Sequence, residues 1–127
     1  MVVEYKLLIV EDNALVREML AVALSDAGFS IVTADDGYEG LACALRERPD
    51  LILTDVEMPN LDGIRMIERL RQEVDLRNTP VLVLSSVHAG RLAQAVVAGA
   101  SSVMQKPVRL AQLITTIRQT LGINVAA

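Results

Sequence analysis

Apolar residues along the chain follow two alternating patterns. Short, nearly continuous apolar runs occur five times, and after each of them apolar residues recur every three to four positions. Continuous runs of this length are typical of parallel strands covered on both faces, and the longer period is typical of amphipathic helices. The predicted strands are 5–10, 29–34, 50–55, 80–85 and 101–105. The pattern predicts an α/β fold, a (βα)5 chain whose right-handed crossovers give a doubly wound, parallel five-stranded sheet.

The helical segments carry their own start and stop signals. Asn13 is a predicted N-cap, and Gly28 ends the first helix. The sequences DDG at 35–37 and LDG at 61–63 are interpreted as turns that begin the next helices. The predicted apolar stripes are Val16, Met19, Leu20, Ala23, Leu24 and Ala27 in the first helix, Ile64, Ile67, Leu70 and Val74 in the third, and Leu110, Leu113, Ile114, Ile117 and Leu121 in the last; the second and fourth helices are predicted at 37–48 and about 89–98.

Length and composition favour a single domain in the cytoplasm. The 127 residues, of which 52% are hydrophobic, suit one domain over 1–127 with a core at about 5–121. No apolar run is long enough for a membrane span, and the N-terminus does not resemble a signal peptide. The net charge is −4 without any Lys/Arg run, which counts against direct nucleic-acid binding. Because only about six residues follow the last predicted helix, we expect no output domain on this chain.

Chemically active side chains gather at the predicted strand ends. The first strand ends in Glu11 and Asp12, the third in Asp55, the fourth in Ser85 and the fifth in Lys106. Ligands of open α/β sheets bind beyond the carboxyl ends of the strands, where the strand order reverses. The sequence therefore predicts three carboxylates, a hydroxyl and an ammonium group at one edge of the sheet.

Such a group of acids needs a counter-charge. Two carboxylates about 4 Å apart repel by roughly 4 kcal/mol at an effective dielectric near 20. Oxygen ligands without nearby His or Cys favour Mg²⁺ over Zn²⁺. Phosphoryl transfer spreads charge over three oxygens, which Mg²⁺, Lys106 and Ser85 would stabilise while Asp55 acts as the nucleophile. Lys106 is one of only two lysines, and the other, Lys6, belongs to the opposite edge.

Several motifs, taken in order, resemble the receiver domain of bacterial two-component response regulators. They are LLIVEDN, DLILTDVEMPNLDG, PVLVLSS and AGASSVMQKPV, and the likeness covers about 5–121. The resemblance implies a flavodoxin-like fold with strand order 2-1-3-4-5. It also implies a protein that is not an enzyme toward other substrates and catalyses only its own phosphorylation and dephosphorylation.

The same resemblance implies roles for individual residues. Asp55 would accept a phosphoryl group from a sensor histidine kinase or a histidine phosphotransfer protein, and Ser85 and Lys106 would contact that group. The domain would then signal through protein contacts or relay the phosphoryl group to another protein. The Mg²⁺ ligands would be Glu11, Asp12, Asp55 and the backbone carbonyl of Glu57. The bond between Lys106 and Pro107 is similar to one that is cis in the family.

Two positions particularise the family pattern. Val103 stands where the family usually has Tyr or Phe, so we do not expect a strong, aromatic-coupled activation of the face made by the fourth helix, the fifth strand and the fifth helix. Glu57 adds a fourth acid beside the site, and we expect it to alter Mg²⁺ affinity or the lifetime of the phosphoryl group. His88 is interpreted as a surface residue and Cys43 as a small packing residue.

Partner surfaces are predicted more coarsely. By resemblance, the end of the first helix would meet the phosphotransfer domain of the kinase. The face of the fourth and fifth helices would contact a downstream protein, or a second copy in a homodimer. Its predicted residues are Arg91, Gln94, Ala95, Val103, Gln105, Arg109, Ala111 and Gln112.

Two other functions remain open at the level of sequence. A metal-dependent phosphatase or small-molecule phosphotransferase would use Asp55 as nucleophile and Glu57 as general acid, but it needs a covering cap. A nucleotide or flavin binder on the same fold lacks support, because no phosphate-binding glycine pattern occurs among the seven glycines.

Overall fold

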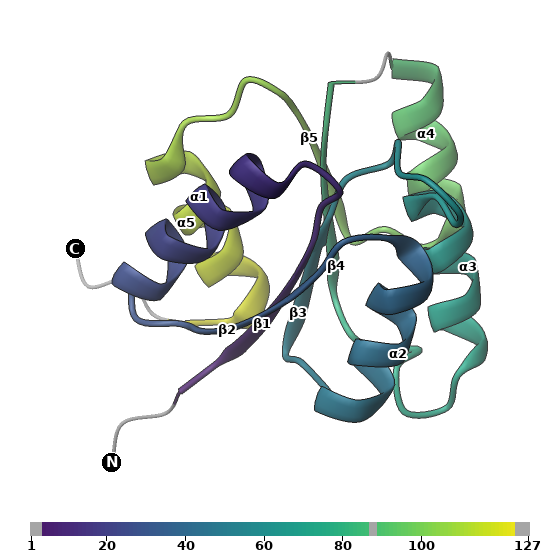
Figure 1. Ribbon diagram of the computed structural model, residues 1–127, viewed down its shortest axis with the longest axis horizontal. Helices are drawn as coiled ribbons and strands as arrows, with labels where there is room; N and C mark the ends of the chain where they lie inside the picture. Colours follow the sequence, from purple (N-terminus) through teal and green to yellow (C-terminus); the bar gives the residue numbers. More distant parts are fainter. Residues whose placement is uncertain (1–3, 87–88, 124–127) are drawn as a thin grey trace.

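The computed structural model describes residues 4–86 and 89–123, and it confirms the alternation of strands and helices (Figure 1). The strands are β1 (Lys6–Val10), β2 (Ser30–Ala34), β3 (Leu51–Thr54), β4 (Val81–Ser85) and β5 (Ser102–Gln105). The helices are α1 (Ala14–Asp26), α2 (Gly37–Glu47), α3 (Gly63–Gln72), α4 (Ala89–Ala98) and α5 (Leu110–Leu121). The predicted position of His88 lies outside the described residues.

The five strands form one parallel sheet in the order β2-β1-β3-β4-β5, as predicted. Helices α1 and α5 cover one face of the sheet, and α2, α3 and α4 cover the other (Figure 1). The chain runs outward from β1 to β2 and returns on the other side of β1 at β3. The strand order therefore reverses between β1 and β3, which is where a ligand site is expected in such sheets.

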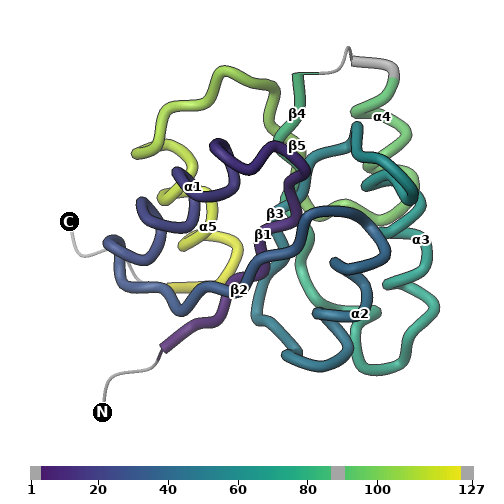
Figure 2. The backbone as a smooth tube through the Cα atoms, viewed as in Figure 1, coloured from purple at the N-terminus to yellow at the C-terminus, as the bar shows by residue number. Residues whose placement is uncertain are grey.

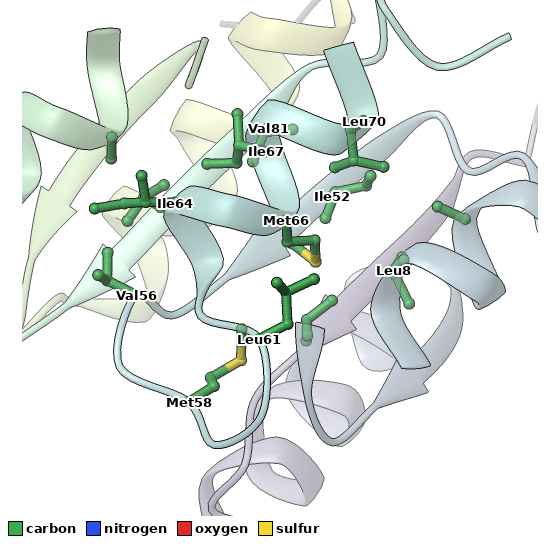
Figure 3. Packing of buried hydrophobic residues seen from close by; sticks show 14 of the residues in the cluster. Leu8, Ile52, Val56, Met58, Leu61, Ile64, Met66, Ile67, Leu70 and Val81 are labelled. Carbon is green, nitrogen blue, oxygen red and sulfur yellow. The ribbon is translucent and has the colours of Figure 1, made fainter. Parts of the chain in front are cut away.

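Alternate residues of β1 belong to two separate hydrophobic cores. Leu8 and Val10 pack with α2, α3 and α4, whereas Leu7 and Ile9 pack with α1 and α5. All four are at most 1% exposed, and burying a side chain of this size contributes about 1.5–3 kcal/mol. Figure 3 shows the first core, in which side chains of α3 lie against those of β1, β3 and β4. Two covered faces explain why the strand sequences are apolar without alternation.

Side-chain caps begin three of the helices. Asn13, Asp36 and Asp62 each accept a hydrogen bond from the backbone N–H three residues later. These bonds satisfy N–H groups that have no partner inside the helix. Gly122 ends α5 in the left-handed conformation, which a glycine adopts without steric cost. The predicted cap at Asn13 and the two predicted turns are confirmed.

Three details of the predicted apolar stripes are wrong. Val74 lies beyond the end of α3 and is 75% exposed, because α3 stops at Gln72. Met19 in α1 and Leu110 in α5 are 62% and 45% exposed. Both lie on the outer rim of their helices and line a groove between α1 and the β5–α5 loop. Periodicity alone cannot separate such a rim from the buried stripe.

One arginine holds together the two loops that lead into β4 and β5. Arg71, at the end of α3, donates to the carbonyl of Gly99 at 2.8 and 3.2 Å and to that of Thr79 at 2.7 Å. It also donates to the carbonyls of Leu76 and Arg77 at 3.1 and 3.2 Å. These bonds tie the α3–β4 loop to the α4–β5 loop. We call this side of the sheet the amino edge, and the opposite side the carboxyl edge.

Candidate functional site

The carboxyl edge brings together the loops that follow β1, β3 and β5, which lie along the upper side of the view in Figure 2. After β1, the side chain of Glu11 turns inward and is 5% exposed, whereas Asp12 is exposed. The Glu11 carboxylate accepts a hydrogen bond from the N–H of Asn13 at 3.2 Å. Arg17 of α1 donates to the backbone carbonyl of Glu11 at 2.8 Å. The β1–α1 loop is therefore fixed by bonds at both of its ends.

Asp55 stands directly after β3. Its N–H continues the sheet by donating to the carbonyl of Val10 at 3.2 Å. Its Oδ1 accepts a hydrogen bond from the N–H of Val56 at 2.6 Å, which restricts rotation of the carboxylate. One oxygen each from Glu11, Asp12 and Asp55 lies within 4.8 Å of the other two. The structure thus brings the three predicted acids together.

Lys106 joins this group from the end of β5. Its Nζ lies 3.1 Å from Glu11 Oε1 and 3.5 Å from Asp55 Oδ2. Its backbone N–H donates to the carbonyl of Ser85 at 2.9 Å, which places the ends of β4 and β5 side by side. Ser85 is fully buried at the end of β4. The bond from Lys106 to Pro107 is cis, as predicted.

Burial and charge act against each other in this cluster. Burial raises the pKa of Glu11 above its usual value of 4.5, although the N–H of Asn13 and the ammonium of Lys106 both lower it. Burial alone would lower the pKa of Lys106, but the carboxylates of Asp55 and Glu11 raise it above 10.5. The site thus favours the charged lysine and disfavours the charged form of Glu11. An additional cation would relieve the second effect.

The β3–α3 loop is held in place from both sides. The side chains of Val56, Met58 and Leu61 point into the core beneath α3 (Figure 3). A Cβ at Gly63 would collide with the carbonyl oxygen of Asp55, so the start of α3 lies directly against the site. Between the buried side chains, Glu57 is exposed on the outer side of the loop.

A second set of contacts ties the same loop to the start of α2. The N–H of Gly37 donates to the carbonyl of Leu61 at 3.1 Å. Asn60 is in the left-handed conformation and donates to Asp36 Oδ2 at 2.8 Å. Asp36 therefore caps α2, as the turn interpretation predicted, and it also anchors the β3–α3 loop.

The donor set fits a small, hard cation. Carboxylate oxygens from two strand ends lie close enough to share one ion, and within the described part of the chain no His or Cys belongs to the cluster. Oxygen ligands of this kind suit Mg²⁺. The Glu57 carbonyl, predicted as a further ligand, belongs to the same loop as Asp55, but its part in a metal site stays a prediction.

Some contacts at this edge were not predicted. The bond from Arg17 to the carbonyl of Glu11 joins residues six positions apart. The only feature of the sequence that could have indicated it is an arginine in the first turns of a helix that follows an acidic pair. Arg91 was assigned to a partner surface, yet it forms ion pairs with Glu57 at 3.4 Å and Asp62 at 3.3 Å. Ala95, assigned to the same surface, is fully buried. That assignment is wrong because α4 turns Ala95 toward α3 and the sheet.

The chain belongs to the response regulator receiver domain family, whose sequence profile matches residues 7–118. It is the receiver domain of a two-component response regulator. Curated relatives include the response regulator MprA of Mycobacterium leprae, which is 38% identical over 117 residues. The match covers 91% of this chain and 50% of that protein, so the chain spans about half the length of the curated relatives it matches.

Solved receiver structures agree with this assignment. The chemotaxis protein CheY4 of Vibrio cholerae has a TM-score of 0.86 at 31% identity, covering 92% of this chain and 98% of that one. The receiver domain of sensor histidine kinase PA1611 from Pseudomonas aeruginosa has a TM-score of 0.88 at 26% identity, covering 94% of this chain and 99% of that one. In that structure a magnesium ion is coordinated in the active-site cleft. Among the described residues here, no helix combines the length and apolar character needed to span a membrane.

Proposed function

We propose that the chain forms one receiver domain over 1–127, with its core at 5–121, that accepts a phosphoryl group on Asp55. The donor is a sensor histidine kinase or a histidine phosphotransfer protein, and the reaction depends on Mg²⁺. The carrying observation is the approach of Glu11, Asp12 and Asp55 to within 4.8 Å, with Lys106 beside two of them. The family membership of the chain supports the same proposal.

The reaction is a direct displacement at phosphorus. A carboxylate oxygen of Asp55 forms a bond to the phosphorus of a phosphohistidine, and the P–N bond breaks as the imidazole leaves and takes up a proton. Bound Mg²⁺, held by Glu11, Asp12, Asp55 and the Glu57 carbonyl, would neutralise charge on the phosphoryl oxygens. Lys106 supplies a second positive charge beside Asp55, at 3.5 Å, and Ser85 supplies a hydroxyl at the end of β4.

Dephosphorylation returns the domain to its starting state. Water attacks the acyl phosphate, the P–O bond to Asp55 breaks and inorganic phosphate leaves. We propose that the domain catalyses these two steps on itself alone. Glu57, the general acid of the phosphatase alternative, is exposed and paired with Arg91, an arrangement that does not favour donation to a leaving group.

The donor surface lies beside Lys106. Helix α1 exposes Leu15, Met19 and Val22 on its outer side. A groove of about 720 Å³ between α1 and the β5–α5 loop continues this apolar strip as far as Leu110. We propose that the histidine-bearing helices of the donor bind here. Met19→Glu should slow transfer from a phosphorylated kinase about tenfold or more and leave labelling by acetyl phosphate unchanged, whereas equal slowing of both reactions would contradict this assignment.

The outgoing signal is assigned to the face formed by α4, β5 and α5. We propose that this face binds a downstream protein and supports a homodimer of the phosphorylated chain, with direct nucleic-acid contacts absent. Val103 on this face is half-buried and carries no ring that could report the state of Ser85. We also propose that the protein is cytoplasmic, because a histidine kinase needs ATP, which is present there, to form its phosphohistidine.

The decisive experiment is labelling with acetyl phosphate and Mg²⁺, followed by mass spectrometry of the intact chain. The wild-type protein should gain the mass of a single phosphoryl group, stable in acid and lost in base, and it should not gain it when Mg²⁺ is chelated. Asp55→Asn is the matched variant and should remain unlabelled. Equal labelling of this variant would contradict the assignment of Asp55.

A further inference from the structure

Arg91 connects α4 to both ends of the segment that runs from Glu57 to Asp62. Its Nε lies 3.4 Å from Glu57 Oε1, and its Nη2 lies 3.3 Å from Asp62 Oδ2. Its Nη1 donates to the side chain of Gln94 at 3.2 Å, within α4. The arginine side chain is 30% exposed, so the guanidinium lies against the loop rather than in free solution.

The backbone leaves Glu57 facing this arginine. Val56 and Met58, on either side of Glu57, are buried in the core beneath α3, and Figure 3 shows both pointing inward. Glu57 therefore points outward, and its side chain is 62% exposed. Within the described residues, Arg91 is the only cation at ion-pair distance from its carboxylate. The direction of this side chain thus depends on one contact across to α4.

Asp62 gives Arg91 a fixed position. The Oδ1 of Asp62 caps α3 by accepting the N–H of Arg65 at 2.9 Å, and its Oδ2 faces Arg91. Because one oxygen is held by the helix start, the other is a fixed anchor for the guanidinium. Arg91 therefore stays where it can bind Glu57.

We propose that Arg91 is a positioning residue that keeps the carboxylate of Glu57 on α4 and away from the cation and the phosphoryl group at Asp55. The inference rests on the proposed function, since it requires a divalent cation among the three acids. Without Arg91, the Glu57 carboxylate would be free to turn toward the cation, two residues from Asp55. A fourth carboxylate near the ion would increase the attraction of the site for Mg²⁺.

The test is a double-mutant cycle read by calorimetric titration of Mg²⁺ into the unphosphorylated chain. Arg91→Gln should tighten Mg²⁺ binding about three- to tenfold, because it releases Glu57 toward the ion. In the Glu57→Gln background, the same substitution should change the affinity by less than about 1.5-fold. Arg91→Lys keeps the positive charge but not the fork that reaches both carboxylates, so its affinity should lie between those of wild type and Arg91→Gln.

The cycle separates positioning from simple loss of a positive charge. If Arg91→Gln tightens binding equally with and without the Glu57 carboxylate, Arg91 acts only through net charge and the inference is wrong. An unchanged affinity in Arg91→Gln, with intact Mg²⁺ binding in wild type, also overturns it while leaving the proposed function in place. If the wild-type chain binds no Mg²⁺, the proposed function itself fails.

Asp62→Asn provides the matched control. Asparagine can still cap α3, but it removes the second ion pair of Arg91. Because Arg91 loses its anchor while Glu57 keeps its partner, the affinity should tighten less than in Arg91→Gln, by about twofold or less. A change as large as that of Arg91→Gln would contradict the role of Glu57. Circular dichroism checks that each variant is folded, and Arg91→Ala replaces Arg91→Gln in the same cycle if the glutamine variant unfolds.

Discussion

The two edges of the sheet use positive charge in opposite ways. At the amino edge, Arg71 donates to four backbone carbonyl groups, and Lys6 pairs with Glu47 at 3.3 Å. At the carboxyl edge, Lys106 pairs with two carboxylates, those of Glu11 and Asp55, which form a cluster with Asp12 in which one oxygen of each acid lies within 4.8 Å of the others. Arg17 also lies at this edge, where its guanidinium donates a hydrogen bond to the backbone carbonyl of Glu11.

The difference separates stability from function. At the amino edge, Arg71 and Lys6 have their partners within the chain itself. At the carboxyl edge the acids outnumber the cations, and burial raises the pKa of Glu11. We expect this excess of negative charge to cost stability in the free protein, and the proposed divalent cation would offset it. We therefore expect substitutions at the amino edge to change stability and those at the carboxyl edge to change chemistry.

The largest expected effect is on the chemistry of Lys106. Lys106→Met removes the positive charge beside Asp55, and the rate of phosphorylation by acetyl phosphate should fall about 100-fold or more, as for other groups that stabilise transition-state charge. Quantitative mass spectrometry over time measures the rate. Lys6→Met is the matched variant at the amino edge, and a comparable loss there would break the comparison.

Arg71 should give the largest change in stability. Arg71→Met leaves the carbonyls of Gly99, Leu76, Arg77 and Thr79 without this donor, and the free energy of unfolding should fall by about 2–4 kcal/mol. Urea unfolding followed by circular dichroism measures it. Arg69, on the same helix, lies 5.4 Å from the ring of Tyr38, and Arg69→Met should cost less than about 1 kcal/mol. Loss of Mg²⁺ binding in folded Arg71→Met would contradict the separation of the two edges.

A smaller effect of opposite sign is expected from Asp55→Asn. Removing one of three neighbouring carboxylates lowers their repulsion, so in the absence of Mg²⁺ at low salt the free energy of unfolding should rise by about 1 kcal/mol. Millimolar Mg²⁺ should stabilise wild type and cancel this advantage. If the asparagine variant is less stable than wild type without Mg²⁺, the carboxyl edge carries no electrostatic strain.

The smallest effect concerns alkaline pH. The folded protein raises the pKa of Lys106 above 10.5, so its ion pairs contribute stability below pH 10.5, and this contribution is lost as the pH rises through the raised pKa. Wild type should lose more stability than Lys106→Met between neutral pH and pH 11. Urea midpoints at several pH values test this, and parallel curves for the two proteins would contradict it.

The sequence was sufficient for the element order and for the three acids. Continuous apolar runs predicted strands that are covered on both faces. Because the strands are parallel, the acids at their carboxyl ends lie at the same edge of the sheet. Helix faces were less certain, because Met19 and Leu110 border a groove that periodicity does not distinguish from the core. The position of Val74 was wrong for a local reason, since α3 ends two residues earlier.

Long-range contacts away from the carboxyl ends of the strands could not be predicted. Arg71 and Gly99 are 28 residues apart, and so are far beyond any local pattern. The pairing of Arg91 with Glu57 and Asp62 depends on how α4 packs beside α3. Such pairs follow from the packing of whole helices, and single-sequence patterns report only one element at a time.

Paramagnetic line broadening by Mn²⁺, observed in amide NMR spectra and reversed by excess Mg²⁺, tests the difference between the edges most directly. We expect the first signals to broaden to be those of Glu11, Asp12 and the residues from Asp55 to Glu57, with Leu76 and Gly99 at the amino edge unaffected. Broadening that begins at the amino edge, or that affects all exposed Asp and Glu residues equally, would contradict a cation site among the three carboxylates.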